Sequence, residues 1–236
     1  MPFTFEFGPV FAHSDTIWDG VMLTLELSAL GILLGLALGI LLALLRGRVP
    51  RAVAWALDGY VELVRNTPFL IQLFIIFFGL PNLGIRLDAF QAAVLTITLN
   101  LGAYAAEIIR AGIESIHPSQ VEAGASLAMT GLQVFRYVVL MPALARVWPS
   151  LTSQFVLTLL STSICSFISV QELSGSAAQV ESDTFRSFET YIVVTLVYLA
   201  LSLLLRMVLA GAGALLFPRG SALARLQGAS GGAGRR

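Results

Sequence analysis

Polar side chains recur at helical spacing inside a hydrophobic stretch of the chain, at Thr96, Asn100, Tyr104 and Glu107. Residues three and four apart lie on one face of an α-helix, so these side chains form a single stripe. Lipid cannot hydrogen-bond them, and the stripe must therefore face protein or water. Amides, hydroxyls and a carboxylate placed in this way could recognise a polar solute.

A second polar stripe is expected farther along the chain, with Gln154, Ser161 and Thr162. Hydroxyl groups can also bond back to a carbonyl of their own helix, so a helix rich in Ser and Thr is weak evidence for a solute path. Two stripes on separate helices are better evidence. The candidates for the substrate path are Thr96, Asn100, Tyr104, Gln154, Ser161 and Thr162.

Charged residues near these stripes allow two interpretations. Arg110 follows Glu107 by three residues and precedes Glu114 by four, a spacing that favours ion pairs within one helix. A gating contact or a contact in a dimer is the alternative. Both interpretations stay open for Arg65, Glu107 and Arg110.

Several classes of enzyme are excluded by residue types. All fourteen basic residues are Arg, and without Lys the chain cannot hold a Gly-rich phosphate loop that ends in Lys. His13 and His117 have no acidic or Cys cluster around them, so we expect no metal site. Ser161 and Ser166 have no His or Lys to activate them as nucleophiles. We therefore expect no catalytic residue, no cofactor bound by this chain and, at zero net charge, no nucleic-acid partner.

The composition indicates an all-α integral membrane protein. Hydrophobic residues make up 57% of the chain and charged residues 12%, whereas about a quarter of the residues in soluble domains are charged. Pro68 should kink or break the second hydrophobic span, because it removes a backbone donor. The five transmembrane helices that we expect are Val21–Leu45, Trp55–Leu80, Ala89–Ile113, Leu151–Val170 and Tyr191–Phe217.

The distribution of Arg predicts the orientation in the membrane. Arg46, Arg48 and Arg51 follow the first span directly, and short Arg-rich loops are usually cytoplasmic. The N-terminus is then outside and, after five spans, the C-terminus is inside. Residues 1–20 should form an external N-terminal segment, residues 21–217 the transmembrane domain, and residues 218–236 a disordered cytoplasmic tail.

A short amphipathic helix is expected at about residues 118–131, on the cytoplasmic side. Pro118 is tolerated as a first helical residue, and Gly131 follows where a left-handed cap is common. The apolar side consists mostly of small residues such as Ala125 and Ala128, which anchor poorly in lipid but allow close approach to another surface. Docking into a protein groove is the better interpretation.

Four ordered motifs give this sequence a resemblance to a known family. Glu122-Ala123-Gly124, with Ala128 where a second Gly is usual and Met141-Pro142 after it, resembles the EAA signature of importer permeases of the ATP-binding-cassette (ABC) class. Residues 60–72, 102–120 and 170–173 resemble the branch of these permeases for polar amino acids such as histidine, glutamine and arginine.

The resemblance implies a mechanism and a set of partners. The amphipathic helix would be the coupling helix, which inserts into a cleft of a cytoplasmic ATPase dimer carrying ATP and Mg. A second permease subunit, identical or different, would complete the path, and an extracytoplasmic solute-binding protein would deliver the solute for alternating access across the bacterial inner membrane. The coupling residues would be Glu122, Ala123, Gly124, Ala125, Ala128, Gly131 and Pro142.

Two other functions are alternatives to an ABC permease. An ion-coupled secondary transporter or channel subunit would work without an ATPase and has no use for a docking helix at residues 118–131. Five spans are also too few for the paired repeats usual in secondary transporters. A membrane scaffold would leave the two polar stripes unexplained.

Overall fold

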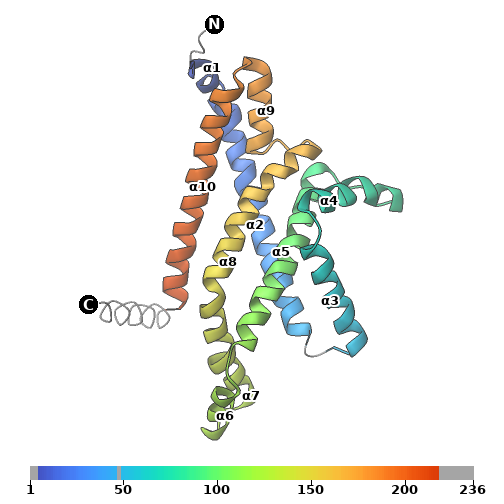
Figure 1. Ribbon diagram of the computed structural model, residues 1–236, viewed down its shortest axis with the longest axis vertical. Helices are drawn as coiled ribbons and strands as arrows, with labels where there is room; N and C mark the ends of the chain where they lie inside the picture. The colour runs from blue at the N-terminus through green and yellow to red at the C-terminus, as the bar shows by residue number, and fades with distance from the viewer. Residues whose placement is uncertain (1–4, 47–48, 218–236) are drawn as a thin grey trace, which may run out of the picture.

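The computed structural model describes residues 5–46 and 49–217. The predicted cytoplasmic tail, residues 218–236, lies outside the described residues, as does Arg48. The described part of the chain is helical, without a strand, which confirms the all-α class (Figure 1). Its α-helices are α1 Gly8–Phe11, α2 Ser14–Leu45, α3 Arg51–Arg65, α4 Phe69–Phe74, α5 Ala89–Glu114, α6 Pro118–Ser126, α7 Gly131–Gln133, α8 Met141–Ser161, α9 Leu173–Thr184 and α10 Ser187–Leu216.

Short helices of other types complete these elements. Ile75–Gly79 and Val134–Leu140 are π-helical, and Leu80–Leu83 and Thr162–Ile168 are 3₁₀-helical. In chain order these helices are η1 to η4, and η3 is Val134–Leu140. The helices η3, α8 and η4 follow one another without a break, and they make one long helical run.

Within residues 5–46 and 49–217, four helical runs are long and apolar enough to cross a membrane, and a fifth is obtained if a bent pair counts as one span. The four are Ser14–Leu45, Ala89–Glu114, Gly131–Ile168 and Ser187–Leu216. Three begin earlier than we expected from hydropathy. They start at Ser14 rather than Val21, at Gly131 rather than Leu151 and at Ser187 rather than Tyr191, because backbone hydrogen bonding continues into polar residues that hydropathy assigns to loops. Part of the expected external segment is therefore helix.

The second hydrophobic stretch is broken, as Pro68 predicts. The α3 helix ends at Arg65, and the helical segment from Phe69 to Leu83 continues at an angle of 112° to it. In Figure 1, α4 accordingly turns away from the direction of α3. Pro68 is the N-cap residue of α4 with an extended backbone, which is the conformation that ends one helix and starts another.

The centre of the molecule is the packing of α2 on α5. Gly31, Gly35 and Gly39 lie one turn apart on α2 and are all buried. A Cβ at these glycines would come within 2.3 Å of the Ile97 side chain, 2.8 Å of Leu101 and 2.6 Å of Ala105. Only glycine permits this approach, so these three residues form a ridge that serves helix packing.

The connection between the fourth and fifth predicted spans contains helix α9, which lies beside α10 and the start of α2 in Figure 1. Its N-cap is Glu172, which is fully buried. The carboxylate accepts hydrogen bonds from the Ser174 and Gly175 amides at 2.9 and 3.0 Å and from the Tyr198 hydroxyl at 2.6 Å. The Thr24 hydroxyl on α2 completes the set at 3.4 Å, so one side chain joins α2, α9 and α10.

Candidate functional site

Helix α6 projects from one end of the molecule and is held by its own caps (Figure 1). It begins at Pro118 and ends at Ser126, earlier than the predicted end at residue 131. The Ala128 amide donates to the Ala125 carbonyl at 3.0 Å and the Met129 amide to the Gly124 carbonyl at 3.3 Å. This pair of bonds is the Schellman motif, in which the residue after the helix takes a left-handed backbone conformation.

The residue with that conformation is Ala128, with φ of 58°, and not Gly131 as we predicted. Gly131 instead begins α7, where Thr130 and Gln133 form a capping box. The helix ends earlier than predicted because the Ala128 and Met129 amides already bond its last carbonyls. A left-handed backbone is costly for any residue with a Cβ, so glycine would be the more favourable residue at this position.

Gly124 is the one buried residue of α6, and it packs inward on its own chain. A Cβ there would lie 3.3 Å from both Val134 and Val138 of η3 and 3.6 Å from the Met129 sulfur. We predicted Gly124 in contact with a partner, whereas in this chain it is the surface on which η3 lies. Its small size thus sets how closely α6 approaches the long helical run that contains α8.

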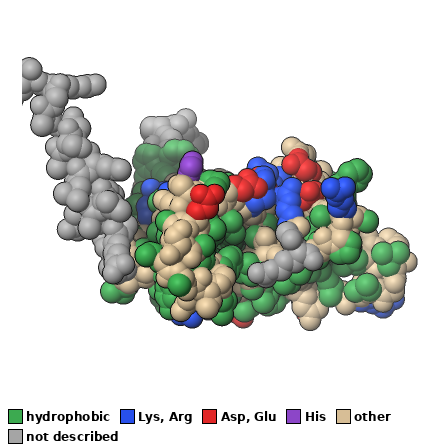
Figure 2. Space-filling view, turned by 90° about the horizontal axis from the view of Figure 1, so that it is seen from below, with side chains coloured by type: hydrophobic (Ala, Val, Ile, Leu, Met, Phe, Trp, Pro, Cys, Tyr) green, Lys and Arg blue, Asp and Glu red, His purple; other side chains and the backbone are tan. Residues whose placement is uncertain are grey.

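The outer surface of α6 is available to a partner. Glu122 and Ala123 are exposed, and Val121 and Leu127 expose apolar side chains, Leu127 by 78%. Figure 2 views this end and shows Arg and acidic side chains on the same face. A groove of about 410 Å³ lies beside α6 and is lined by Val121, Ala125, Met129, Gly131, Val134, Phe135 and Val139. Pro142, the last predicted coupling residue, belongs to the first turn of α8.

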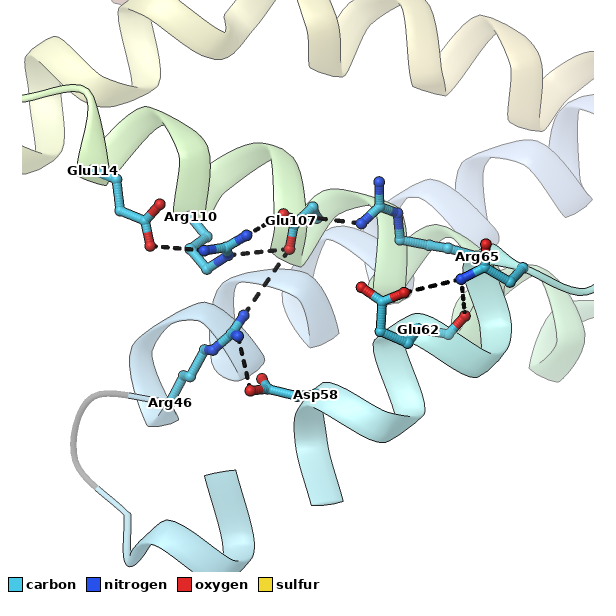
Figure 3. Close-up of polar contacts among 8 residues, drawn as sticks. Arg46, Asp58, Glu62, Arg65, Glu107, Arg110 and Glu114 are labelled. Carbon is cyan, nitrogen blue, oxygen red and sulfur yellow. Dashed lines mark hydrogen bonds and ion pairs between the residues drawn. The ribbon is translucent and has the colours of Figure 1, made fainter. Parts of the chain in front are cut away.

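A cluster of ion pairs joins three helices near the same end (Figure 3). Glu107 of α5 is paired with Arg110 through a hydrogen bond of 3.1 Å from Nε, and Arg110 also reaches Glu114 at 2.8 Å. The predicted pairs within one helix are therefore present. The Glu107 carboxylate also lies 3.9 Å from Arg65 of α3 and 4.0 Å from Arg46 of α2. Glu107 thus joins α2, α3 and α5.

The hydroxyls of three predicted path residues are bonded to their own helices. Thr96, which is fully buried, donates to the Ala92 carbonyl at 2.7 Å. Ser161 donates to the Leu157 carbonyl at 2.8 Å and Thr162 to the Leu159 carbonyl at 2.7 Å. These hydroxyls are satisfied locally, so their presence in a membrane helix requires no solute.

Asn100 and Tyr104 face the break between α3 and α4. The Asn100 amide donates to the Gln72 side chain at 3.0 Å, and the Tyr104 hydroxyl donates to the Arg65 carbonyl at 3.3 Å. Gln154 on α8 differs from both, since its half-buried side chain makes no hydrogen bond within residues 5–46 and 49–217. Of the predicted path amides, Gln154 is the one free to meet a solute.

Four residues with central contacts were missed by the sequence analysis of the site. Arg46 pairs with Asp58 at 2.8 Å as well as with Glu107, and Gln72 and Glu172 bond side chains or backbone from several helices. In the sequence, Arg46 was used only to predict the orientation in the membrane. Glu172 was included only as part of the motif at residues 170–173. Gln72 could have been found, because it lies one turn after a proline that leaves a carbonyl without its donor.

Comparisons with known proteins agree with this architecture. Residues 35–218 match the family described as binding-protein-dependent transport system inner membrane component. A probable glutamine ABC transporter permease protein, GlnM of Bacillus subtilis (strain 168), is 36% identical over 82% of this chain and 90% of its own length. The glutamine transport system permease protein GlnP of Escherichia coli (strain K12) is 34% identical over 87% of this chain and 94% of its own length.

A solved structure is similar over nearly its whole length. It is described as an amino acid ABC transporter with histidines, and it superposes with a TM-score of 0.82 at 33% sequence identity. The match covers 89% of this chain and 99% of that chain. The chain therefore belongs to the family of inner membrane components of binding-protein-dependent transport systems, and it is a multi-pass permease subunit of an ABC importer.

Proposed function

We propose that this permease moves a polar amino acid across the bacterial inner membrane by alternating access, driven through α6 by a separate ATPase dimer. The observation that best supports this proposal is the exposed surface of α6 and the apolar groove beside it. Gly124 packs on η3 and so fixes the position of α6. A rigid projection of this kind can transmit a movement of the ATPase to the membrane helices. The ion-coupled alternative gives it no role.

The proposed topology has five membrane spans. The bent pair of α3 with α4 counts as one span, which gives five and puts the N-terminus outside and the C-terminus inside. Arg46, Arg51, Arg136 and Arg146 then lie on the cytoplasmic side with α6, and Arg86 lies outside. Labelling of Gln120→Cys from inside and Ser182→Cys from outside, in a Cys165→Ser background, tests this; labelling of both from one side would overturn it.

The proposed partners follow from the absence of Lys in the sequence and from the family of ABC importer permeases. ATP and Mg would be bound by the ATPase dimer, since the sequence has no Lys for a phosphate loop. A second permease subunit, identical or different, would complete the path beside the membrane lipid, and an extracytoplasmic solute-binding protein would deliver the solute. Purification in mild detergent, followed by identification of the co-purifying proteins, tests this set.

A polar amino acid is the proposed substrate class. The relatives named for glutamine support it, as does the free amide of Gln154, which can both donate to and accept from a solute. The test is uptake of labelled polar amino acids by vesicles that hold the complete importer. Gln154→Leu should change the preference among them without lowering the melting temperature, whereas an unchanged preference would exclude Gln154 from the path.

A further inference from the structure

The last backbone carbonyls of α3 accept hydrogen bonds from side chains. The last carbonyls of any helix lack a donor from the next turn, and lipid cannot supply one. Here α3 ends beside the middle of α5, since its Arg65 carbonyl receives the hydroxyl of Tyr104. The three preceding carbonyls, of Glu62, Leu63 and Val64, receive side-chain donors from Asn66 at 2.8 Å, Thr67 at 2.8 Å and Gln72 at 2.7 Å.

The Val64 carbonyl has a specific reason to need Gln72. In a continuous helix it would accept from the amide four residues later, but that residue is Pro68, which has no N–H. The Gln72 Nε2 takes this place and also lies 3.0 Å from the Thr67 carbonyl and 2.9 Å from the Thr67 hydroxyl. Gln72 thus replaces the donor that the proline removed.

These contacts fix the orientation of the Gln72 amide. Its nitrogen faces the Val64 and Thr67 oxygens, so its oxygen is directed elsewhere and accepts from the Asn100 Nδ2 of α5. A rotation of the amide by half a turn would place its oxygen against other oxygens, which is unfavourable. One side chain therefore bonds the end of α3, the start of α4 and the middle of α5.

The α5 helix leads directly to α6. Its C-cap is Ser115, and the Ser115 carbonyl accepts from Arg146 of α8 at 2.7 Å, only three residues before Pro118. A displacement of α6 must therefore move the end of α5. Because α5 is a single unbroken helix from Ala89 to Glu114, the displacement reaches Asn100.

We propose that Gln72 is a positioning residue for transport, which ties the break between α3 and α4 to α5 so that a movement received at α6 also moves α4. This inference rests on the proposed contact of α6 with the ATPase. The two nearest alternatives are that Gln72 only caps α3 and that Asn100 only binds solute. They differ in what happens when the two residues are changed together.

The test is a double-mutant cycle in the complete importer, with its ATPase and binding protein in vesicles. Gln72→Leu and Asn100→Leu should each lower the initial uptake rate about tenfold, the factor expected for one lost hydrogen bond between these half-buried side chains. The double variant should be no slower than Gln72→Leu alone. Basal ATP hydrolysis should persist while its stimulation by loaded binding protein falls. Losses that multiply in the double variant would overturn the proposal.

A second variant separates positioning from capping. Pro68→Ala in the Gln72→Leu background returns an N–H to the Val64 carbonyl, so it should restore the melting temperature but not uptake. Restored uptake would show that Gln72 only caps α3. Asn82→Leu is the matched control, because Asn82 is exposed and its side chain bonds only the Phe78 carbonyl of its own segment among the described residues; uptake should stay within about twofold. Uptake by the unmodified importer distinguishes failure of the proposed function from failure of this inference.

Discussion

Gly124 and Val134 lie in direct contact across the turn between α6 and η3, with 3.3 Å from the position of a Gly124 Cβ to the Val134 side chain. This contact explains a small residue at the centre of α6 without a partner protein. Gly124→Leu should force the two helices apart and lower stability by about 1 to 3 kcal/mol, the usual cost of overpacking. Thermal melting in detergent measures this. An unchanged melting temperature would show that Gly124 is not packed as described.

Ala128→Gly should stabilise the protein. The left-handed backbone at Ala128, with φ of 58°, costs roughly 1 kcal/mol for a residue with a Cβ and nothing comparable for glycine. Ala125→Gly is the control within α6, since a helical backbone there makes glycine unfavourable. The melting temperature should rise for the first variant and fall for the second. A fall for Ala128→Gly would contradict the Schellman cap.

Glu107→Gln should destabilise the junction of α2, α3 and α5. The change leaves the guanidinium groups of Arg46, Arg65 and Arg110 close together without the carboxylate that they share. We expect a loss of about 1 to 3 kcal/mol, because hydrogen bonds to charged partners are lost. Glu114→Gln is the control, since the Glu114 side chain is 61% exposed and such pairs contribute about 0 to 1 kcal/mol. Equal melting temperatures for the two variants would contradict the role of Glu107.

The pH dependence of stability should separate two carboxyl groups near α9. Burial raises the pKa of the Glu172 carboxyl, although its hydrogen bonds act in the opposite direction. The folded state then holds this proton more tightly than the unfolded chain, so the contribution of Glu172 falls as pH rises from its unfolded pKa of about 4.3. Melting of Glu172→Gln beside the unmodified protein should show a difference that grows in favour of the variant as pH rises.

Glu181 is the control with the opposite sign. The hydroxyls of Ser187 and Tyr191, at 2.6 and 2.8 Å, hold the pKa of the Glu181 carboxyl below its usual range. Its contribution is present above the unfolded pKa and is lost as pH falls through the folded value. Glu181→Gln should therefore lose its disadvantage in acid. The same trend with pH for both variants would contradict these assignments.

Much of the fold could be predicted from local sequence. Pro68 removes a backbone donor wherever it lies in a helix, so the break needed no knowledge of the neighbouring helices. Gly31, Gly35 and Gly39 similarly mark a close contact by their spacing alone. The start of α2 at Ser14 was not predictable in this way, because hydropathy detects the lipid-embedded part of a helix and not its polar extension.

The candidate site was less predictable, because spacing shows which residues share a face but not what that face meets. Thr96 and Asn100 belong to one stripe, yet Thr96 bonds its own helix and Asn100 bonds Gln72 from another. The left-handed residue after α6 was assigned to Gly131 by residue type. The structure places it at Ala128, where the closing hydrogen bonds of the helix outweigh the preference of alanine.

The central claim is that an ATPase acts on this permease through the exposed surface of α6. Glu122→Arg reverses a charge on that surface without touching the Gly124 contact, and Asp183→Arg makes the same change on α9 at the other end of the molecule. The measurement is ATP-driven uptake in vesicles, with membrane abundance and co-purification of the ATPase determined for each variant. We predict that Glu122→Arg loses uptake and retains less ATPase at normal abundance, while Asp183→Arg retains its ATPase. Normal uptake by Glu122→Arg, with its ATPase still bound, would contradict the claim.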